Sequence, residues 1–201
     1  MTPKAVVFDI GNVLITWNPE RLYDQLLDKV ERERIFEAVD LHGMNDRIDR
    51  GEPIKETDYA TAEKYPEHAD LIRIWHDRWI EMASPLIDGS WAILRKLRSE
   101  GIPVYALSNF GVESFAYAET QYPELAEFDR RYISGHMKTI KPEAKIYEML
   151  EADSGLSGDE LFFTDDRAEN IEAAVARGWQ GHVFTGPDAL GAALRDLGMP
   201  V

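Results

Sequence analysis

The stretch VVFDIGNVL at residues 6–14 places one aspartate, Asp9, directly after a β-branched apolar run. A run of this kind predicts a buried strand. A carboxylate at the end of such a strand is costly unless it is solvated, paired or bound to a cation. Gly11 follows two residues later and offers only its backbone. Asp9 therefore needs a binding partner or a chemical role, and the absence of a side chain at Gly11 needs an explanation.

Short apolar runs alternate with helix-like segments along most of the chain. Strands are predicted at residues 4–10, 102–109, 131–135, 160–166 and 181–184, and helices at residues 89–100, 112–120, 143–152, 168–177 and 188–197. This alternation predicts an α/β fold, with a Rossmann-like parallel sheet and helices on both of its faces. In such folds, ligands bind outside the carboxyl ends of the strands.

The alternation is interrupted over residues 17–84, where no strong strand is predicted. Residues 19–39 have helical periodicity, and further helical segments follow them. One interpretation is an ordinary helical stretch of the core. We favour a small α-helical cap inserted at residues 17–84, because the next strand is predicted only near residue 102. The α/β core then consists of residues 1–16 and 85–201.

The composition limits the classes of partner. The chain has 37 acidic residues against 22 lysines and arginines, which gives a formal net charge of −15. A polyanion would be repelled over most of this surface, so we expect no nucleic-acid partner, although a small anion can bind where the local field is positive. The sequence has no cysteine, which favours the cytoplasm as the compartment. No stretch reaches the roughly 18 apolar residues of a membrane span, so no membrane partner is expected.

Polar side chains stand at four predicted strand ends and loops. They are Asp9, the pair Ser108–Asn109, Lys141 in IKPEAKIY, and the pair Asp165–Asp166 in FFTDDRAENI. Each of them taken alone has an ordinary explanation as a turn, helix-cap or loop residue. A parallel sheet, however, brings its strand ends to one edge. We therefore expect these side chains to form one site.

The chemistry of such a site follows from its residue types. Three carboxylates in one crevice repel each other unless a cation joins them. Oxygen ligands without histidine or cysteine suit Mg²⁺, which also binds phosphate oxygens. Lys141 and the Ser108 hydroxyl can hold other oxygens of a phosphoryl group, and an aspartate can attack phosphorus to form an aspartyl-phosphate. The pattern indicates phosphoryl transfer beside a cation.

Four motifs in this order resemble those of the haloacid dehalogenase (HAD) superfamily. They are FDIGNVL, LSN, IKPEAKIY and FFTDDRAENIEAA. Within the superfamily, the chain is most similar to the F-D-(L/I)-G-N-V branch, which includes bacterial glucose-1-phosphate phosphatases. The resemblance implies a phosphoric monoester hydrolase that acts on a small phosphorylated metabolite, such as a sugar phosphate and in particular a sugar 1-phosphate. It also implies that residues 17–84 form a cap that selects substrates and excludes water.

The resemblance further implies roles for individual residues. Asp9 would be the nucleophile, Lys141 would neutralise charge during the reaction, and Ser108 and Asn109 would contact the phosphoryl group. Mg²⁺ is the implied cofactor, and its implied ligands are Asp9, the backbone carbonyl of Gly11, Asp165 and Asp166. Which residue of the acidic pair binds the metal directly is left open by the sequence.

Position 11 departs from the pattern of the superfamily. Most of its phosphatases carry an aspartate two residues after the nucleophile, which acts as general acid and then as general base. Gly11 can still offer a carbonyl to a metal, but it has no proton to give. Either another group supplies the proton, or the substrate has a leaving group that needs little protonation, or the activity is weak. A hemiacetal oxygen, as in a sugar 1-phosphate, is a better leaving group than an ordinary alkoxide.

Two other functions are compatible with parts of the sequence. Haloacid dehalogenases use the same aspartate to attack carbon without a metal, but they usually carry SSN near the position of Asp165. A weakly active or non-catalytic HAD-fold binding protein is the second alternative, and Gly11 supports it.

The sequence is compatible with a monomer or a small homo-oligomer. We expect Trp75 and Trp79 to pack a cap helix, and Arg47, Arg50 and Arg78 to lie on a solvated face.

Overall fold

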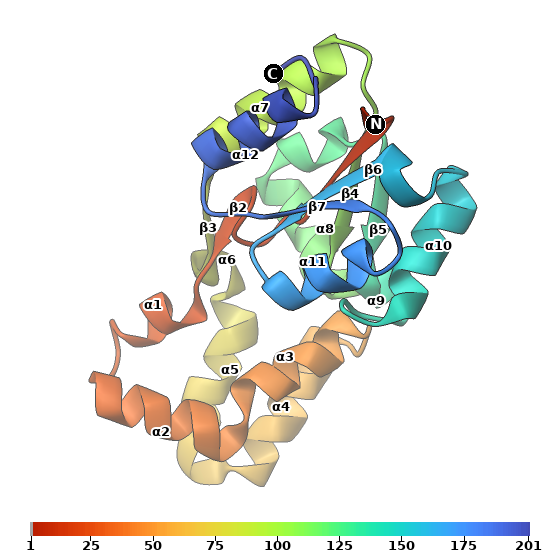
Figure 1. Cartoon of the computed structure of the whole chain (residues 1–201). Helices are drawn as coiled ribbons and strands as arrows, with labels where there is room; N and C mark the ends of the chain where they lie inside the picture. Colours follow the sequence, from red (N-terminus) through yellow and green to blue (C-terminus); the bar gives the residue numbers. More distant parts are fainter. Residues whose placement is uncertain (1) are drawn as a thin grey trace.

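A parallel β-sheet lies at the centre of the computed structural model, which describes residues 2–201. Its strands have the order β5-β4-β1-β6-β7, and every neighbouring pair is parallel. The bounds are β1 (Ala5–Phe8), β4 (Val104–Ser108), β5 (Arg130–Ile133), β6 (Leu161–Asp165) and β7 (Gln180–Val183). The predicted parallel α/β fold is confirmed, and β1 with its terminal Asp9 occupies the middle of the sheet (Figure 1).

Helices cover both faces of this sheet because successive side chains of a buried strand point to opposite sides. Val6 and Phe8 belong to one apolar cluster, whereas Ala5 and Val7 belong to another. The first cluster contains side chains of α7 (Asp88–Ser99), α8 (Val112–Gln121) and α12 (Pro187–Asp196). The second contains side chains of α10 (Ala144–Ser154) and α11 (Ala168–Val175). A short helix, α9 (Ser134–Met137), follows β5 directly.

A group of helices is inserted between the first two motifs and lies at one end of the molecule (Figure 1, orange to yellow). We call residues 19–82 the inserted segment. Its helices are α1 (Pro19–Tyr23), α2 (Lys29–Val39), α3 (Leu41–Asp49), α4 (Ile54–Lys64), α5 (Ala69–Asp77) and α6 (Trp79–Met82). Trp75 is fully buried there among the rings of Tyr23 and Phe36. These rings belong to the same apolar cluster as Val6 and Phe8 of β1, so the inserted segment packs continuously onto one side of the core.

Two details differ from the sequence prediction. A two-stranded antiparallel sheet of β2 (Ile15–Trp17) and β3 (Ala83–Leu86) frames the inserted segment, although no strand is predicted there before residue 102. Both strands are short and β3 contains a proline, so neither gives a periodic apolar signal. The helix predicted over residues 19–39 is two helices, α1 and α2, because Asp28 caps a new helix by accepting a hydrogen bond from the Glu31 backbone N–H at 2.9 Å.

The turn after α3 fastens the inserted segment to the core. The Ser134 hydroxyl donates a hydrogen bond to the Asp49 carbonyl at 2.6 Å. The Ile54 backbone N–H donates to the Glu113 carboxylate at 2.9 Å, and the Arg50 guanidinium pairs with Glu143 at 2.6 Å. These contacts fix the carboxyl end of α3 against α8, α9 and the start of α10.

The three arginines of the inserted segment that are predicted to lie on a solvated face each pair with a carboxylate. Arg47 pairs with Glu52 and Arg78 pairs with Glu81, both within the segment, whereas Arg50 pairs with Glu143 of the core.

Among residues 2–201, none of the helices combines the length and the apolar character needed to cross a membrane.

The buried carboxyl of Asp58 on α4 predicts a pH dependence of stability. Burial, with a further contribution from the charge of Asp77, raises the pKa of Asp58 from 3.8 to about 8. Between these two values the folded protein holds a proton that the unfolded chain releases. Stability therefore falls as pH rises through this window, at most by about 1.4 kcal/mol per pH unit.

The variant Asp58→Asn lacks this titration. We compare the free energy of unfolding of the variant with that of the wild type. The difference in favour of the variant should be larger at about pH 9 than at about pH 5. Urea unfolding of both proteins at the two pH values measures the difference. An equal difference at both values would show that Asp58 is ionised in the folded protein throughout the window.

Candidate active site

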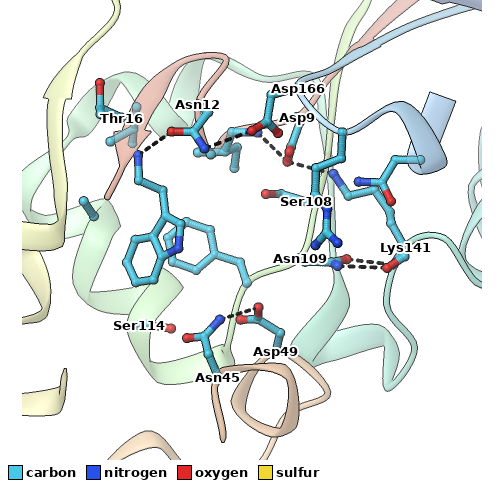
Figure 2. A pocket seen from close by; sticks show the side chains of 18 of the residues that line it. Asp9, Asn12, Thr16, Asn45, Asp49, Ser108, Asn109, Ser114, Lys141 and Asp166 are labelled. Carbon is cyan, nitrogen blue, oxygen red and sulfur yellow. Dashed lines mark hydrogen bonds and ion pairs between the residues drawn. The ribbon is translucent and has the colours of Figure 1, made fainter. Parts of the chain in front are cut away.

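The ends of three neighbouring strands bring the predicted site residues together at one cavity. Asp9 follows β1, Ser108 ends β4 and Asp165 ends β6, while Lys141 comes from the loop before α10. The cavity has a volume of about 440 Å³ and is lined by core loops on one side and by the inserted segment on the other. Figure 2 shows Asp9, Ser108, Asp166 and Lys141 converging on it. The structure brings Asp9, Ser108, Lys141 and Asp166 to one cavity, and Asp165 lies beside it as the partner of Lys141, while the roles of these residues stay predictions.

Lys141 lies between two carboxylates. Its Nζ is 2.8 Å from Asp9 Oδ1 and 2.6 Å from Asp165 Oδ2, and the residue is only 2% exposed. Burial alone would lower the pKa of this ammonium group. The charges of Asp165 and Asp9, and the hydrogen bonds to both, outweigh burial and raise the Lys141 pKa above its ordinary value. Lys141 is therefore a permanent cation held against the candidate nucleophile.

Asp9 is buried at the inner end of the cavity and 7% exposed. Burial raises its pKa to about 7, and the charge of Asp165 adds to this effect. The charge of Lys141 and hydrogen bonds from Lys141 and Ser108 oppose the shift. The backbone N–H of Ile10 also donates to Asp9 Oδ1 at 2.8 Å. The anionic form of Asp9 thus depends on positive charge near it.

The acidic pair after β6 is oriented by two asparagines. Asn170 Nδ2 lies 3.0 and 2.9 Å from the two carboxylate oxygens of Asp165. Asn12 Nδ2 donates to Asp166 Oδ2 at 2.9 Å. The amide of Asn12 cannot turn away, because its Oδ1 accepts a hydrogen bond from the Trp17 backbone N–H at 2.9 Å. Asp165 is therefore turned toward Lys141, and Asp166 toward the cavity.

The carboxylates of Asp9, Asp165 and Asp166 fit a divalent metal. One oxygen from each lies within 4.8 Å of the others, and Lys141 is the single lysine paired with the cluster in the described part of the chain. Three acids beside one lysine leave a negative charge that a cation would neutralise. The donors are all oxygen, which suits Mg²⁺. When bound, the ion would neutralise phosphate oxygens and bring an anionic substrate beside an anionic nucleophile.

Gly11 and Asn109, the other two predicted site residues, also line the cavity. The Asn109 side chain bonds the backbone of Lys141 twice, donating to its carbonyl at 3.0 Å and accepting from its N–H at 2.7 Å. Asn109 thereby positions Lys141. A contact of Asn109 with a phosphoryl group, and of the Gly11 carbonyl with a metal, stay predictions.

The wall of the cavity contributed by the inserted segment is not predicted from the sequence. His42, Asn45, Asp46 and Asp49 line it from α3. Their spacing places them on one face of a helix whose opposite face buries Leu41, Met44 and Ile48. This polar stripe is the signal in the sequence that identifies a helix facing a cavity.

Aromatic rings form a second part of the wall. Trp79, which is predicted to pack a cap helix, also lines the cavity, and its ring centroid is 5.9 Å from that of Trp17 and 5.4 Å from that of Phe110. All three residues line the cavity. The part of a ligand that lies beyond Ser108 would therefore meet both carboxylates and aromatic faces.

Comparison with known proteins gives a family match over most of the chain. The model of the family described as haloacid dehalogenase-like hydrolase matches residues 3–178. Among characterised proteins, the chain is similar to a sesquiterpene phosphatase from Aspergillus oryzae, with 26% identity over 209 residues that cover 98% of this chain and 97% of the relative. It is also similar to an enolase-phosphatase from Bradyrhizobium, with 29% identity over 53% of this chain and 47% of the relative.

Solved structures share the fold. A HAD-family enzyme from Bacteroides thetaiotaomicron, crystallised with magnesium and inorganic phosphate, superposes with a TM-score of 0.73 at 24% identity, covering 92% of this chain and 95% of that one. The L-2-haloacid dehalogenase of Xanthobacter autotrophicus superposes with a TM-score of 0.63 at 15% identity, covering 89% and 76%. At these identities the likeness concerns the fold.

The acidic cluster predicts stabilisation of the protein by Mg²⁺. A ligand that binds only the folded state at a hundredfold excess over its Kd adds about 2.7 kcal/mol. We expect Mg²⁺ to raise the Tm of the wild type, and Asp166→Asn to need more Mg²⁺ for the same rise. Asp46→Asn, which removes a carboxylate of the same cavity outside the cluster, should shift the titration less. A Tm that does not respond to Mg²⁺ would contradict a metal site here.

Proposed function

This chain belongs to the haloacid dehalogenase-like hydrolases, and we propose that it is a Mg²⁺-dependent phosphatase that hydrolyses a small phosphorylated metabolite through an aspartyl-phosphate on Asp9. The observation that carries the proposal is the position of Asp9. It stands at the end of the central strand, 2.8 Å from the ammonium group of Lys141 and in one cluster with Asp165 and Asp166. This position between a fixed cation and two further carboxylates supports a nucleophilic role for Asp9 and a metal-binding role for the cluster.

Each residue has a chemical task in the proposed reaction. Asp9 attacks phosphorus, and Lys141 stabilises the negative charge that gathers on the phosphoryl oxygens. The Ser108 hydroxyl, which donates to Asp9, can turn to a phosphoryl oxygen when substrate is bound. Asp9, Asp165, Asp166 and the Gly11 carbonyl are the proposed Mg²⁺ ligands.

The relatives support a phosphatase over a dehalogenase. Both a sesquiterpene phosphatase and an enolase-phosphatase are similar in sequence, and a structural neighbour holds magnesium and phosphate. A dehalogenase is also a structural neighbour. Metal-independent attack on carbon, however, gives no role to Asp166, which points to the cavity beside Asp9 and is held there by Asn12.

Three observations bear on the proposed finer substrate class. The FDIGNVL motif favours the glucose-1-phosphate phosphatase-like branch and hence a sugar 1-phosphate. The aromatic wall of Trp17, Trp79 and Phe110 suits the apolar face of a sugar ring, and it equally suits an apolar alkyl or isoprenoid chain. The similarity to a sesquiterpene phosphatase favours the second class.

We propose that residues 17–84 act as the cap of this enzyme, with the remaining residues as the catalytic core. The cavity lies where the two parts meet, since α3 and α6 line it from one side and the strand ends from the other. A substrate would place its phosphate on the core and its organic part against the inserted segment. The inserted segment would then select among phosphate esters.

The proposed function predicts Mg²⁺-dependent release of phosphate. We expect the wild type to hydrolyse nitrophenyl phosphate and members of a panel of phosphorylated metabolites, to lose this activity in EDTA and to regain it with Mg²⁺. Asp9→Asn should lose nearly all activity while it stays folded, because an amide is a poor nucleophile. Asp70→Asn, a change of an exposed aspartate on α5, is the matched control and should keep wild-type turnover.

Two results would contradict the proposal. Full turnover by folded Asp9→Asn would remove the nucleophile from its role. Release of halide from a haloacid in the presence of EDTA, without phosphatase activity in Mg²⁺, would assign the dehalogenase reaction instead.

A further inference from the structure

The reaction needs a proton donor that the core side of the cavity does not offer. When the P–O bond breaks, its electron pair goes to the leaving oxygen, and that oxygen needs a proton. Gly11 has no side chain, Lys141 is bound between Asp9 and Asp165, and Asp166 belongs to the metal cluster. A donor must therefore come from elsewhere on the cavity wall.

We propose that Asp49, at the carboxyl end of α3 in the inserted segment, is the general acid and general base of this enzyme. This inference rests on the proposed phosphatase function. Asp49 lines the same cavity as Asp9 but belongs to the opposite wall. Figure 2 shows Asp49 with Asn45 on one side of the pocket and Asp9 with Asp166 on the other, with Ser108 and Asn109 between them. A phosphate held at Asp9 would direct its leaving group across this space.

The carboxyl group of Asp49 is held in place by a chain of hydrogen bonds. The indole N–H of Trp75 donates to Asn45 Oδ1 at 3.1 Å, which fixes the orientation of the Asn45 amide. Asn45 Nδ2 then donates to Asp49 Oδ2 at 2.9 Å. The Asp49 backbone is bound to the core through its carbonyl, which accepts from Ser134. These contacts hold the Asp49 carboxyl group at one position on the cavity wall.

The surroundings of Asp49 suit a proton donor at neutral pH. The residue is 9% exposed, and burial raises its pKa to about 8. The charges of Asp46 and Asp9 raise the pKa further, while the charge of Lys141 and a hydrogen bond from the Gly111 backbone lower it. His42, Asp166 and Arg167 complete the titratable groups of the cavity wall in the described chain. A carboxyl group that is neutral near pH 7 can donate a proton and later take one back.

His42 is the other candidate donor on this wall, and its position is less suitable. Its Nε2 is 3.2 Å from Glu20 Oε1, and its side chain is 60% exposed. It therefore lies at the outer rim of the cavity and is engaged with a carboxylate there. Asp49 lines the same cavity but is buried.

With Asp49 as acid and base, every proton and bond is accounted for in the two steps of the proposed reaction. In the first, an Asp9 oxygen bonds to phosphorus, the bond from phosphorus to the leaving oxygen breaks, and the proton of Asp49 goes to that oxygen to give the alcohol. In the second, a water oxygen bonds to phosphorus, the Asp49 carboxylate takes the water proton, and the bond from phosphorus to Asp9 breaks. Inorganic phosphate leaves, and both aspartates return to their starting forms.

The test compares leaving groups that differ in their need for a proton. We expect Asp49→Asn to lower kcat/KM for a primary alkyl phosphate by about 10²–10³, the contribution typical of general acid catalysis. For dinitrophenyl phosphate, whose phenolate leaves unprotonated, kcat/KM should change by less than about tenfold. The wild-type kcat/KM for the alkyl ester should fall as pH rises through about 8, because Asp49 loses its proton, and Asp49→Asn should lack this alkaline decline.

Two further variants separate catalysis from structure. Asp58 has a pKa that burial also raises to about 8, but it lies on α4 and does not line the cavity. Asp58→Asn should keep the wild-type dependence on leaving group. Gly11→Asp should replace the missing proton donor. The substitution is sterically possible, because the Gly11 backbone lies outside the left-handed region and an added Cβ would lie 3.8 Å from Trp17 Cβ. In the Asp49→Asn background it should restore hydrolysis of the alkyl ester.

Each outcome decides the inference. Equal loss for both leaving groups, without rescue by Gly11→Asp, would show that Asp49 only supports the fold of the site. Unchanged kcat/KM for the alkyl ester in folded Asp49→Asn would exclude it as the acid. If the wild type hydrolyses neither ester in Mg²⁺, the phosphatase function itself fails, which is distinct from a failure of Asp49 alone.

Discussion

The ion pairs of Lys141 with Asp9 and Asp165 are the interaction on which the rest of the site depends. They join the ends of β1 and β6, two adjacent strands at the middle of the sheet, to the loop before α10. A buried pair of this kind gains little net stability, since the charges lose their hydration, but removal of one partner costs about 3–5 kcal/mol. The fold therefore maintains a lysine and several acids in close contact for a chemical reason. Asn109 fixes the lysine backbone, and Asn170 and Asn12 fix the acids.

The cavity divides the chemistry between two parts of the chain. The strand ends provide Asp9 as the proposed nucleophile and the proposed metal ligands, and the loop before α10 provides the positive charge of Lys141. The inserted segment provides Trp79 of the aromatic wall and Asp49, and its position depends on the contacts of Ser134, Glu113 and Glu143 with the turn after α3. If Asp49 is the general acid, proton transfer to the leaving group requires the inserted segment to be packed against the core. An acidic side chain at position 11 would then be redundant, because Asp49 already supplies the proton.

The sequence predicts the core of this structure well, for physical reasons that are local. Buried parallel strands such as residues 161–165 appear as continuous apolar runs, and the alternation with helices places Asp9, Ser108 and Asp165 at one edge. The short strands β2 and β3 escape prediction because their pairing is long-range and Pro85 weakens the signal. Asp49 escapes because its approach to the cavity depends on how α3 packs against the loop after β4. No local pattern encodes that contact, although the polar stripe from His42 to Asp49 hints at it.

The central claim is that Asp9 bonds covalently to phosphorus during turnover. The most direct measurement is mass spectrometry of the peptide that contains Asp9, after rapid acid quench of the enzyme with dinitrophenyl phosphate and Mg²⁺. The account predicts a phosphate adduct on this peptide that is absent in EDTA, and a heavy oxygen from labelled water that appears in the released phosphate and not in Asp9. Incorporation of the heavy oxygen into the Asp9 carboxylate, without a phosphate adduct, would contradict it, because that result belongs to an ester formed on carbon.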